Sequence, residues 1–161
     1  MGFTAVQNSK PVGAIETAPI ATTTLKGYLY CDGASYLRSD YPLLFAAIGT
    51  AHGAADGTHF NVPDYRGVFI RGHADGQATD PDRATRSSMN SGGSTGDNVG
   101  SMQGSEFESH DHTMSATPST GLVSGGSTIP ATGYASIFTT DVSGGNETRP
   151  VNAYSKFFIR Y

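Results

Sequence analysis

The sharpest chemical signal in this sequence is the tripeptide His110-Asp111-His112. On an extended strand alternate side chains point the same way, so the imidazoles of His110 and His112 would face one side together. Imidazole nitrogen suits iron, nickel, copper and zinc. Two histidines make half of a metal site at best, and two histidines that flank an aspartate in a polar loop are usually just solvated. The motif therefore predicts a metal only if further ligands come from elsewhere.

Three identical chains around a threefold axis would supply those further ligands. Six imidazole nitrogens, in two layers of three, would form an octahedral site. Six ligands indicate Fe²⁺ or a similar ion, because structural Zn²⁺ is almost always four-coordinate. A closed site leaves no open position for water or substrate, so the metal would join the chains and would not catalyse a reaction. No pattern in the sequence indicates an organic cofactor.

Other sequence patterns that could support catalysis or ion binding have simpler explanations. Residues 92–96 (Gly-Gly-Ser-Thr-Gly) match the G-x-S-x-G nucleophile elbow, but that motif needs a buried strand before the serine and a helix after it, and the flanks predict neither. The acidic residues Asp75, Asp80 and Asp82 lack EF-hand spacing and are expected in a solvated loop. The single Cys31 is expected to be a small buried hydrophobe. We therefore predict no catalytic residues.

Aromatic and short polar side chains lie together late in the chain, a combination that is typical of carbohydrate contacts. A glycan site combines an aromatic face for the apolar side of a sugar with polar groups for its hydroxyls. Tyr134, Ser136, Phe138 and Asp141 are the candidates. Tyr134 is the better candidate for an exposed contact, since Phe138 could instead fill the narrow core of a trimer.

The composition explains why more than one copy is expected. Hydrophobic residues make up 37% of the 161 residues, with 21 Gly and no Trp. So polar a chain buries little apolar area against the entropy of ordering its backbone, about 1–2 kcal/mol per residue. The missing burial is expected to come from identical neighbours. The net charge is −4 and the ten Lys and Arg residues are scattered, so nucleic acid is not an expected partner. No apolar run approaches the ~20 residues of a membrane span, so membrane insertion is not expected either.

The most regular elements are predicted in residues 11–72. The segment 27–31 reads as a strand, and Asp32-Gly33 as the turn after it. Apolar residues at positions 41, 44, 45 and 48 predict a short amphipathic helix, with Asp40 as a possible cap and Gly49 as its end. Residues 60–71 are expected to form two short strands separated by a Pro-Asp turn.

The rest of the chain is more polar until its last residues. Val99 is the only Val, Ile or Leu in residues 73–106, a stretch that would be read as a linker if taken alone. The final segment, residues 156–161, alternates Phe157, Ile159 and Tyr161 on one face and predicts a strand. We expect that strand to pair back with residues 11–72, which would make the intervening stretch an insertion from a base. His52, His59 and His73 are expected at the surface or in structural roles.

Residues 11–72 resemble the phage tail collar domain. The order, spacing and types of residues agree, except that Tyr28 stands where the family often has Trp. The matching runs are 11–13 (Pro-Val-Gly), 27–33 (Gly-Tyr-Leu-Tyr-Cys-Asp-Gly), 41–45 (Tyr-Pro-Leu-Leu-Phe), 48–49 (Ile-Gly) and 60–72 (Phe-Asn-Val-Pro-Asp-Tyr-Arg-Gly-Val-Phe-Ile-Arg-Gly). Later segments resemble the C-terminal parts of such fibres: 82–83, 95–103, 110–112 and 147–153.

The resemblance implies an α+β fold, mostly β and irregular, in an interwoven homotrimeric fibre tip with a collar-like base. Its expected parts are an upstream tail or shaft remnant at 1–10, the tail collar domain at 11–72, a trimeric tip insertion at 73–143, and a segment returning to the base at 144–161. Members of the family with His-x-His at the tip bind axial iron or zinc, which favours a structural metal on the trimer axis at His110 and His112. Specificity is expected to vary within 107–143.

The expected function is adhesion by a trimeric tail-fibre tip, in a virion or an extracellular fibre. Its expected partners are two copies of itself, an upstream fibre shaft, and a host surface glycan, lipopolysaccharide or outer-membrane protein. Three alternatives stay open: a bacterial surface fibre adhesin of phage origin, a purely structural fibre or baseplate component, and a polysaccharide depolymerase. The last would need paired carboxylates in a groove, for which Glu106 and Glu108 are the nearest pair.

Overall fold

The computed structural model describes residues 10–106 and 150–161. In this part of the chain the structure consists of short strands and irregular segments with one short α-helix. That agrees with the expected fold class, mostly β and irregular with little helix. The interweaving of three copies stays a prediction.

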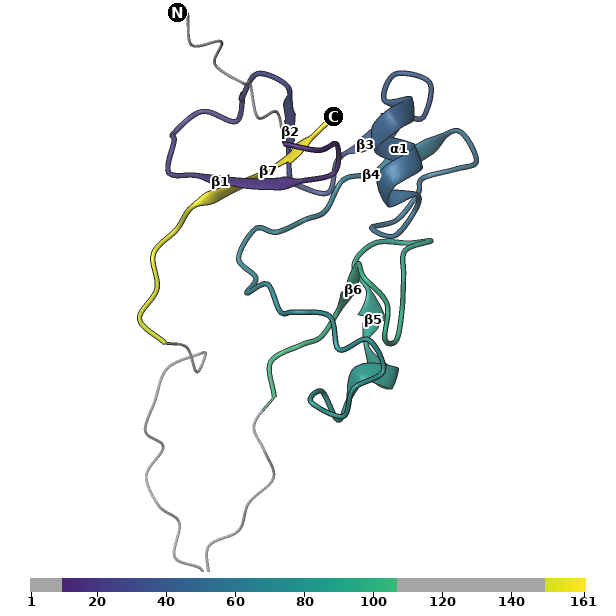
Figure 1. Cartoon of the computed structure of the whole chain (residues 1–161), viewed down its shortest axis with the longest axis vertical. Coiled ribbons are helices and arrows are strands. Elements are labelled where there is room, and N and C mark those ends of the chain that lie inside the picture. Colours follow the sequence, from purple (N-terminus) through teal and green to yellow (C-terminus); the bar gives the residue numbers. More distant parts are fainter. Residues whose placement is uncertain (1–9, 107–149) are drawn as a thin grey trace, which may run out of the picture. The chain divides into compact units, whose positions relative to one another are not determined.

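The largest sheet contains the two ends of the described chain. It joins β1 (Ile15–Ala18), β7 (Lys156–Arg160) and β2 (Tyr28–Tyr30) in the order β1-β7-β2, with both pairings antiparallel (Figure 1). The last strand in the sequence is therefore the middle strand of the sheet. Its Ile159 lies opposite both Ile15 and Leu29. Phe158 and Ile159, which point to opposite faces, are both fully buried, so the sheet is covered at this point on both sides.

A hairpin-like pair lies beside the helix. Strands β3 (Ser35–Leu37) and β4 (His59–Asn61) are antiparallel and place Tyr36 opposite Phe60. Helix α1 (Pro42–Ile48) lies between them in the sequence. The predicted amphipathic helix is confirmed: Leu44 is buried, and Tyr41, Phe45 and Ile48 pack partly buried against the core.

The ends of α1 are only partly as expected. Pro42 occupies its first turn, and the backbone N–H of Gly49 donates to the Phe45 carbonyl at 2.8 Å, which ends the helix at the predicted residue. The expected cap by Asp40 is wrong. Tyr41 is the residue at the N-terminal boundary, and no side chain caps the helix there.

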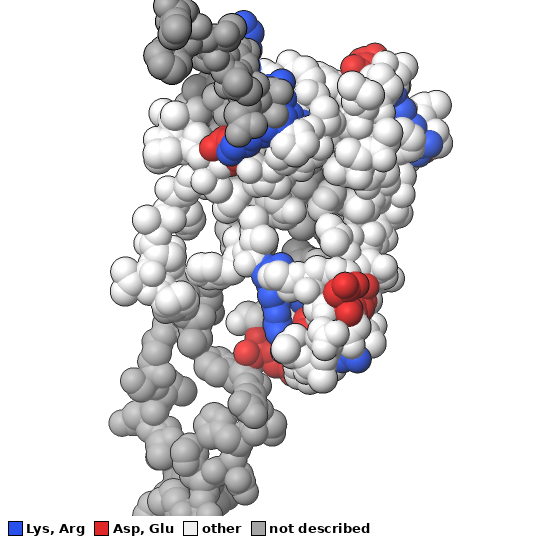
Figure 2. All heavy atoms as spheres, in the orientation of Figure 1, with Lys and Arg blue, Asp and Glu red and all other residues white. Residues whose placement is uncertain are grey.

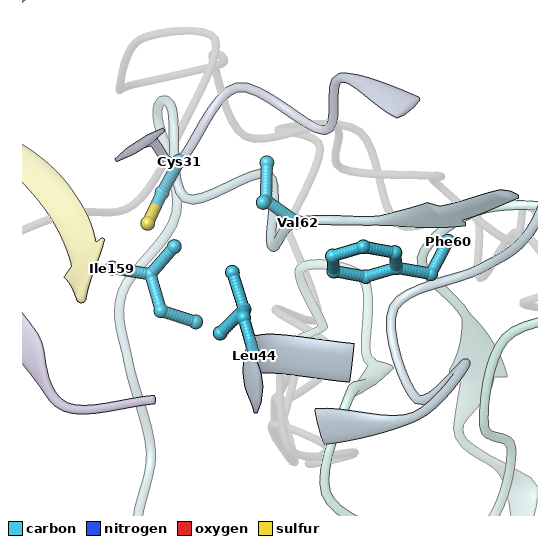
Figure 3. Close-up of a cluster of buried hydrophobic side chains, with 5 residues drawn as sticks. All are labelled: Cys31, Leu44, Phe60, Val62 and Ile159. Carbon is cyan, nitrogen blue, oxygen red and sulfur yellow. The ribbon is translucent and has the colours of Figure 1, made fainter. Parts of the chain in front are cut away.

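One apolar cluster joins the sheet, the hairpin and the helix. Its buried members meet side by side, and Cys31 is one of them, as predicted; they are Cys31, Leu44, Phe60, Val62 and Ile159 (Figure 3). Backbone bonds around Cys31 hold these elements together. Its N–H donates to the Phe157 carbonyl at 3.0 Å, and its carbonyl accepts from the Tyr65 N–H at 3.1 Å. Burial raises the pKa of the Cys31 thiol to about 12.

The second strand predicted within residues 60–71 is wrong. The structure has β4 followed by a bridge at Asp64 and a turn, and residues 68–74 belong to no strand. Further along are a single 3-10 turn, η1 (Arg83–Thr85), and a two-stranded ladder of β5 (Ser87–Ser88) and β6 (Ser101–Met102). The polar stretch 73–106, which would be read as a linker if taken alone, therefore has local structure within one chain.

Candidate functional site

The predicted site residues lie outside the described part of the chain. His110 and His112, proposed as metal ligands, fall within residues 107–149, as do the predicted receptor contacts Tyr134, Ser136, Phe138 and Asp141. What the structure describes is the folded base on either side of that stretch. One compact unit contains the chain up to Gly104 and again from Val151.

On the C-terminal side, the base holds the chain by strand β7 and by Lys156 at its start. The Lys156 ammonium donates to the Thr22 carbonyl at 3.1 Å and also to the carbonyl of Ala21. It lies 5.9 Å from the centroid of the Tyr30 ring. The strand pairings and these contacts fix where the chain re-enters the base.

On the N-terminal side of residues 107–149, the guanidinium of Arg86 contacts several groups near β6. Nε donates to Ser101 Oγ at 3.0 Å, and Nη2 donates to the Ser101 carbonyl at 3.3 Å. Nη1 reaches Gln103 Oε1 at 2.8 Å and Asp80 Oδ2 at 3.2 Å. Asp80 is only 4% exposed. Its expected place in a solvated loop is wrong, because two arginines surround it: Arg86 pairs with it closely and Arg71 lies at 3.7 Å.

The segment after β5 docks on the loop that follows α1 through backbone contacts. The Ser94 N–H donates to the Ala51 carbonyl at 2.9 Å, and the Ala54 N–H donates to the Ser91 carbonyl at 3.0 Å. A Cβ on Gly100 would lie 2.3 Å from the Ala51 carbonyl oxygen, and Gly100 has a φ of +94°. Only glycine allows this approach. Gly100 is therefore required for this packing.

His52 lies in the same contact region and is buried, with 4% of its surface exposed. Its carbonyl accepts from the side-chain amide of Asn90 at 2.9 Å, and its ring meets Tyr65 edge-on, with centroids 6.2 Å apart. Nδ1 has no hydrogen-bond partner among the described residues. Burial lowers the pKa of His52. Of the two positions expected for this histidine, surface or structural, it occupies the second.

The described residues hold no arrangement that indicates catalysis. Within residues 10–106 and 150–161 there is no group of three or more His, Cys, Asp or Glu side chains placed to hold a metal. Ser94, in the chance G-x-S-x-G match, lies in a turn region that no helix follows, so the elbow geometry is not formed. No helix in these same ranges has the length and apolarity needed to cross a membrane.

The surface of the base carries few charges and one apolar run. Lys and Arg atoms form small separate groups interspersed with acidic ones on the face shown in Figure 2. The run is Val68-Phe69-Ile70, whose members are all exposed; Phe69 is 65% exposed. Within the described residues, the backbone N–H groups of this run donate no hydrogen bond. Arg66 and Arg71, on either side, pair with Asp64 and Asp80 in the same chain.

A family model described as Phage Tail Collar Domain matches residues 13–70. These residues include β1, β2, β3, α1 and β4. Protein RhiB of Rhizobium leguminosarum bv. viciae is 32% identical over 164 residues, an alignment that covers 96% of this chain and 73% of RhiB. The chain belongs to the phage tail collar family.

Two further relatives of this collar protein come from Escherichia coli and from a phage. Protein StfE of E. coli strain K12 is 34% identical over 102 residues, or 63% of this chain and 44% of StfE. The short tail fiber protein gp12 of Enterobacteria phage T4 is 30% identical over 112 residues, or 66% of this chain and 21% of gp12. The matches support a phage-type tail fibre component and indicate no enzyme family.

Sequence reasoning missed the residues that hold the segment after the collar. Arg86 and Asp80 are six positions apart in a stretch without helical periodicity, so nothing in their spacing marks them as a pair. Gly53, Gly93 and Gly100 were not singled out by the sequence, although each faces backbone or side-chain atoms of another segment. The one available signal was the resemblance of 82–83 and 95–103 to tail fibres.

Proposed function

We propose that this chain is the receptor-binding end of a phage-type tail fibre, active as a homotrimer in a virion or in an extracellular fibre. Its host-surface ligand is a glycan, lipopolysaccharide or an outer-membrane protein. The observation that carries the proposal is membership of the tail collar family together with the relationship to a short tail fiber protein. The protein is not an enzyme under this proposal.

The folded base supports presentation of the segment that follows it. The chain leaves the compact unit after Gly104 and re-enters it at Val151. Re-entry leads into the central strand of the main sheet, so both ends of residues 107–149 are attached to the same ordered body. Recognition loops held by a rigid scaffold lose less entropy on binding than free ones.

The exposed run Val68-Phe69-Ile70 supports association with other copies. Three adjacent large apolar side chains in an otherwise polar chain indicate a contact surface. Unpaired backbone donors can join a strand from another chain. Arg66 pairs with Asp64 and Arg71 lies near Asp80, so each cation that flanks the run has a carboxylate of its own chain nearby.

Light scattering tests the homotrimer. The wild-type protein is expected to have a mass in solution three times that of the monomer. The Phe69→Lys variant is expected to have a smaller mass. Leu43→Lys is the matched control, because Leu43 is 70% exposed but has no other exposed large apolar side chain beside it in α1. A well-folded wild-type monomer at micromolar concentration would contradict the trimer.

Binding to a bacterial glycan array and to lipopolysaccharide-containing vesicles tests recognition. Tyr134→Ala is expected to weaken retention at least tenfold. The matched control is Tyr154→Ala, an exposed tyrosine outside residues 107–149, which is expected to bind as wild type. Equal retention of both variants would remove Tyr134 from the site.

Metal analysis of the purified trimer tests the axial ion. About one iron or zinc per three chains is expected, six imidazoles from His110 and His112 being its ligands. His110→Ala is expected to abolish the metal content. A metal content unchanged by this variant would contradict the site.

A second candidate is a bacterial surface fibre of phage origin. An alignment that covers 96% of this chain is to a protein of Rhizobium leguminosarum. A purely structural fibre or baseplate component would also form a trimer but would be retained on no array. Release of reducing sugar from surface polysaccharide, lost on Glu106→Gln or Glu108→Gln, would instead indicate a depolymerase.

A further inference from the structure

The guanidinium of Arg86 joins three points of the chain that are separate in sequence. Strand β5, which follows Arg86 directly, pairs with β6. Nη1 of Arg86 donates back to Asp80 and forward to Gln103, and Nε and Nη2 donate to Ser101. Gln103 is the last side chain before Gly104, where the compact unit ends. Arg86 therefore contacts the residues from which the 105–150 stretch leaves the base.

The contacts of Arg86 are directional and shielded. Its side chain is mostly buried, and a planar guanidinium with five donors fixes the relative positions of the acceptors around it. The four acceptors come from three residues: the Asp80 carboxylate, the hydroxyl and the carbonyl of Ser101, and the side-chain amide oxygen of Gln103. A buried carboxylate alone would need only one cation nearby, and Arg71 already lies near Asp80. The additional bonds to Ser101 and Gln103 hold strand β6 and the residue after it in place.

We propose that Arg86 is a positioning residue, which holds residues 101–103 in place just before the inserted segment begins. The segment carries the predicted receptor contacts, so this inference rests on the proposed function. Fixing the root of a binding segment pre-organises it for contact with the host surface. Arg86 itself is not proposed to touch the receptor.

Three variants separate positioning from simple charge neutralisation. Arg86→Met removes every donor but keeps the length of the side chain. It also leaves Asp80 as a buried carboxylate without its closest cation, which lowers the thermal midpoint. The double variant Asp80→Asn/Arg86→Met removes that lone charge too. Arg71→Met is the matched control, because Arg71 contacts Asp80 but neither Ser101 nor Gln103.

Amide hydrogen exchange at Ser101 and Met102 gives the deciding measurement. In Arg86→Met, exchange is expected to be faster by about tenfold or more, since hydrogen bonds to a charged donor are lost. In the double variant the thermal midpoint is expected to return toward wild type while exchange stays fast. Arg71→Met is expected to leave exchange at both amides unchanged.

Two outcomes would overturn the proposal. Unchanged exchange in Arg86→Met would show that β6 is held by other contacts. Recovery of slow exchange in the double variant would show that Arg86 only compensates Asp80. Retention on lipopolysaccharide-containing vesicles is measured in parallel, and the double variant is expected to bind at least tenfold more weakly than wild type. If the wild type binds no surface ligand, the proposed function fails, while the exchange result still decides the role of Arg86.

Discussion

The base sheet and the segment of residues 73–103 are folded by different forces. The base buries an apolar cluster in which Phe60, Leu44 and Ile159 are fully enclosed. The segment contains one Val, Ile or Leu residue, Val99, and that residue is exposed. Its order comes from an ion pair, from the Arg86 contacts and from backbone bonds to the loop after α1. Backbone and charge can thus order a stretch that hydrophobic burial alone would leave unfolded.

The two regions also use glycine differently. In the base, Gly49 ends a helix. In the segment, Gly100 permits another backbone to approach more closely than any side chain allows. A high glycine content is typical of linkers, and here it is also the means by which one segment packs on another. Four experiments test this difference between the two regions, in order of decreasing effect on stability.

Phe60→Ala is expected to lower the free energy of unfolding by about 3–5 kcal/mol, because it empties the centre of the apolar cluster. Guanidinium denaturation measures the loss. Leu43→Ala, at an exposed apolar position of α1, is the control and is expected to stay within about 0.5 kcal/mol of wild type. A loss below about 1 kcal/mol for Phe60→Ala would mean that the cluster does not stabilise the base.

Gly100→Ala is expected to cost about 1–3 kcal/mol, through its positive φ and the clash with the Ala51 carbonyl. The effect should be confined to the segment, with faster amide exchange at Ser94 and Ala54. Gly104→Ala, at a site where a Cβ meets nothing within 4 Å, serves as the comparison and should exchange as wild type. If both variants behave alike, the docking described above is not what orders the segment.

Acid is expected to weaken the contact region through His52. Burial lowers the pKa of this histidine in the folded state, so the unfolded chain binds the proton more readily. The stabilising contribution is complete above the unfolded value of ~6.5 and is lost as the pH falls from there toward the lowered folded pKa. Unfolding free energies at several pH values between 7.5 and 5 measure it. His52→Phe should remove this part of the slope, and an unchanged slope would assign it to other groups.

Labelling of Cys31 is the experiment with the smallest expected effect on stability, and it measures how well the fold protects the thiol from a reagent. Its thiol is buried and its pKa is raised to about 12 by that burial, so very little thiolate forms at neutral pH. A thiol reagent such as DTNB should react with the folded protein only as fast as the base opens. Fast labelling without denaturant would contradict the position of Cys31 in the cluster.

The sequence predicted best where one element carries its own pattern. The apolar spacing at Tyr41, Leu44, Phe45 and Ile48 predicts α1 because a helix needs no distant partner for its periodicity. Residues 27–31 predict β2 from their strand-forming types. The second strand predicted within residues 60–71 was wrong although Val68, Phe69 and Ile70 favour strands, since strand formation also needs a neighbour to pair with.

Contacts between distant polar residues could not be predicted. Asp80 was expected in solvent because an acidic residue in a Gly-rich stretch is usually exposed, and only the fold brings Arg86 and Arg71 to it. The candidate site was predicted from His110, His112 and Tyr134, which lie outside the described residues, so those assignments stay predictions. The base that carries them was found through family resemblance and strand patterns.

The middle position of β7 has a consequence for how the protein is made. Strands β1 and β2 are not neighbours in the sheet, and β7 is the strand with which each of them pairs. On the ribosome, the first two strands cannot be joined until residues 156–160 have emerged. A product that is terminated before residue 156 lacks the strand that joins them, so its base sheet cannot close.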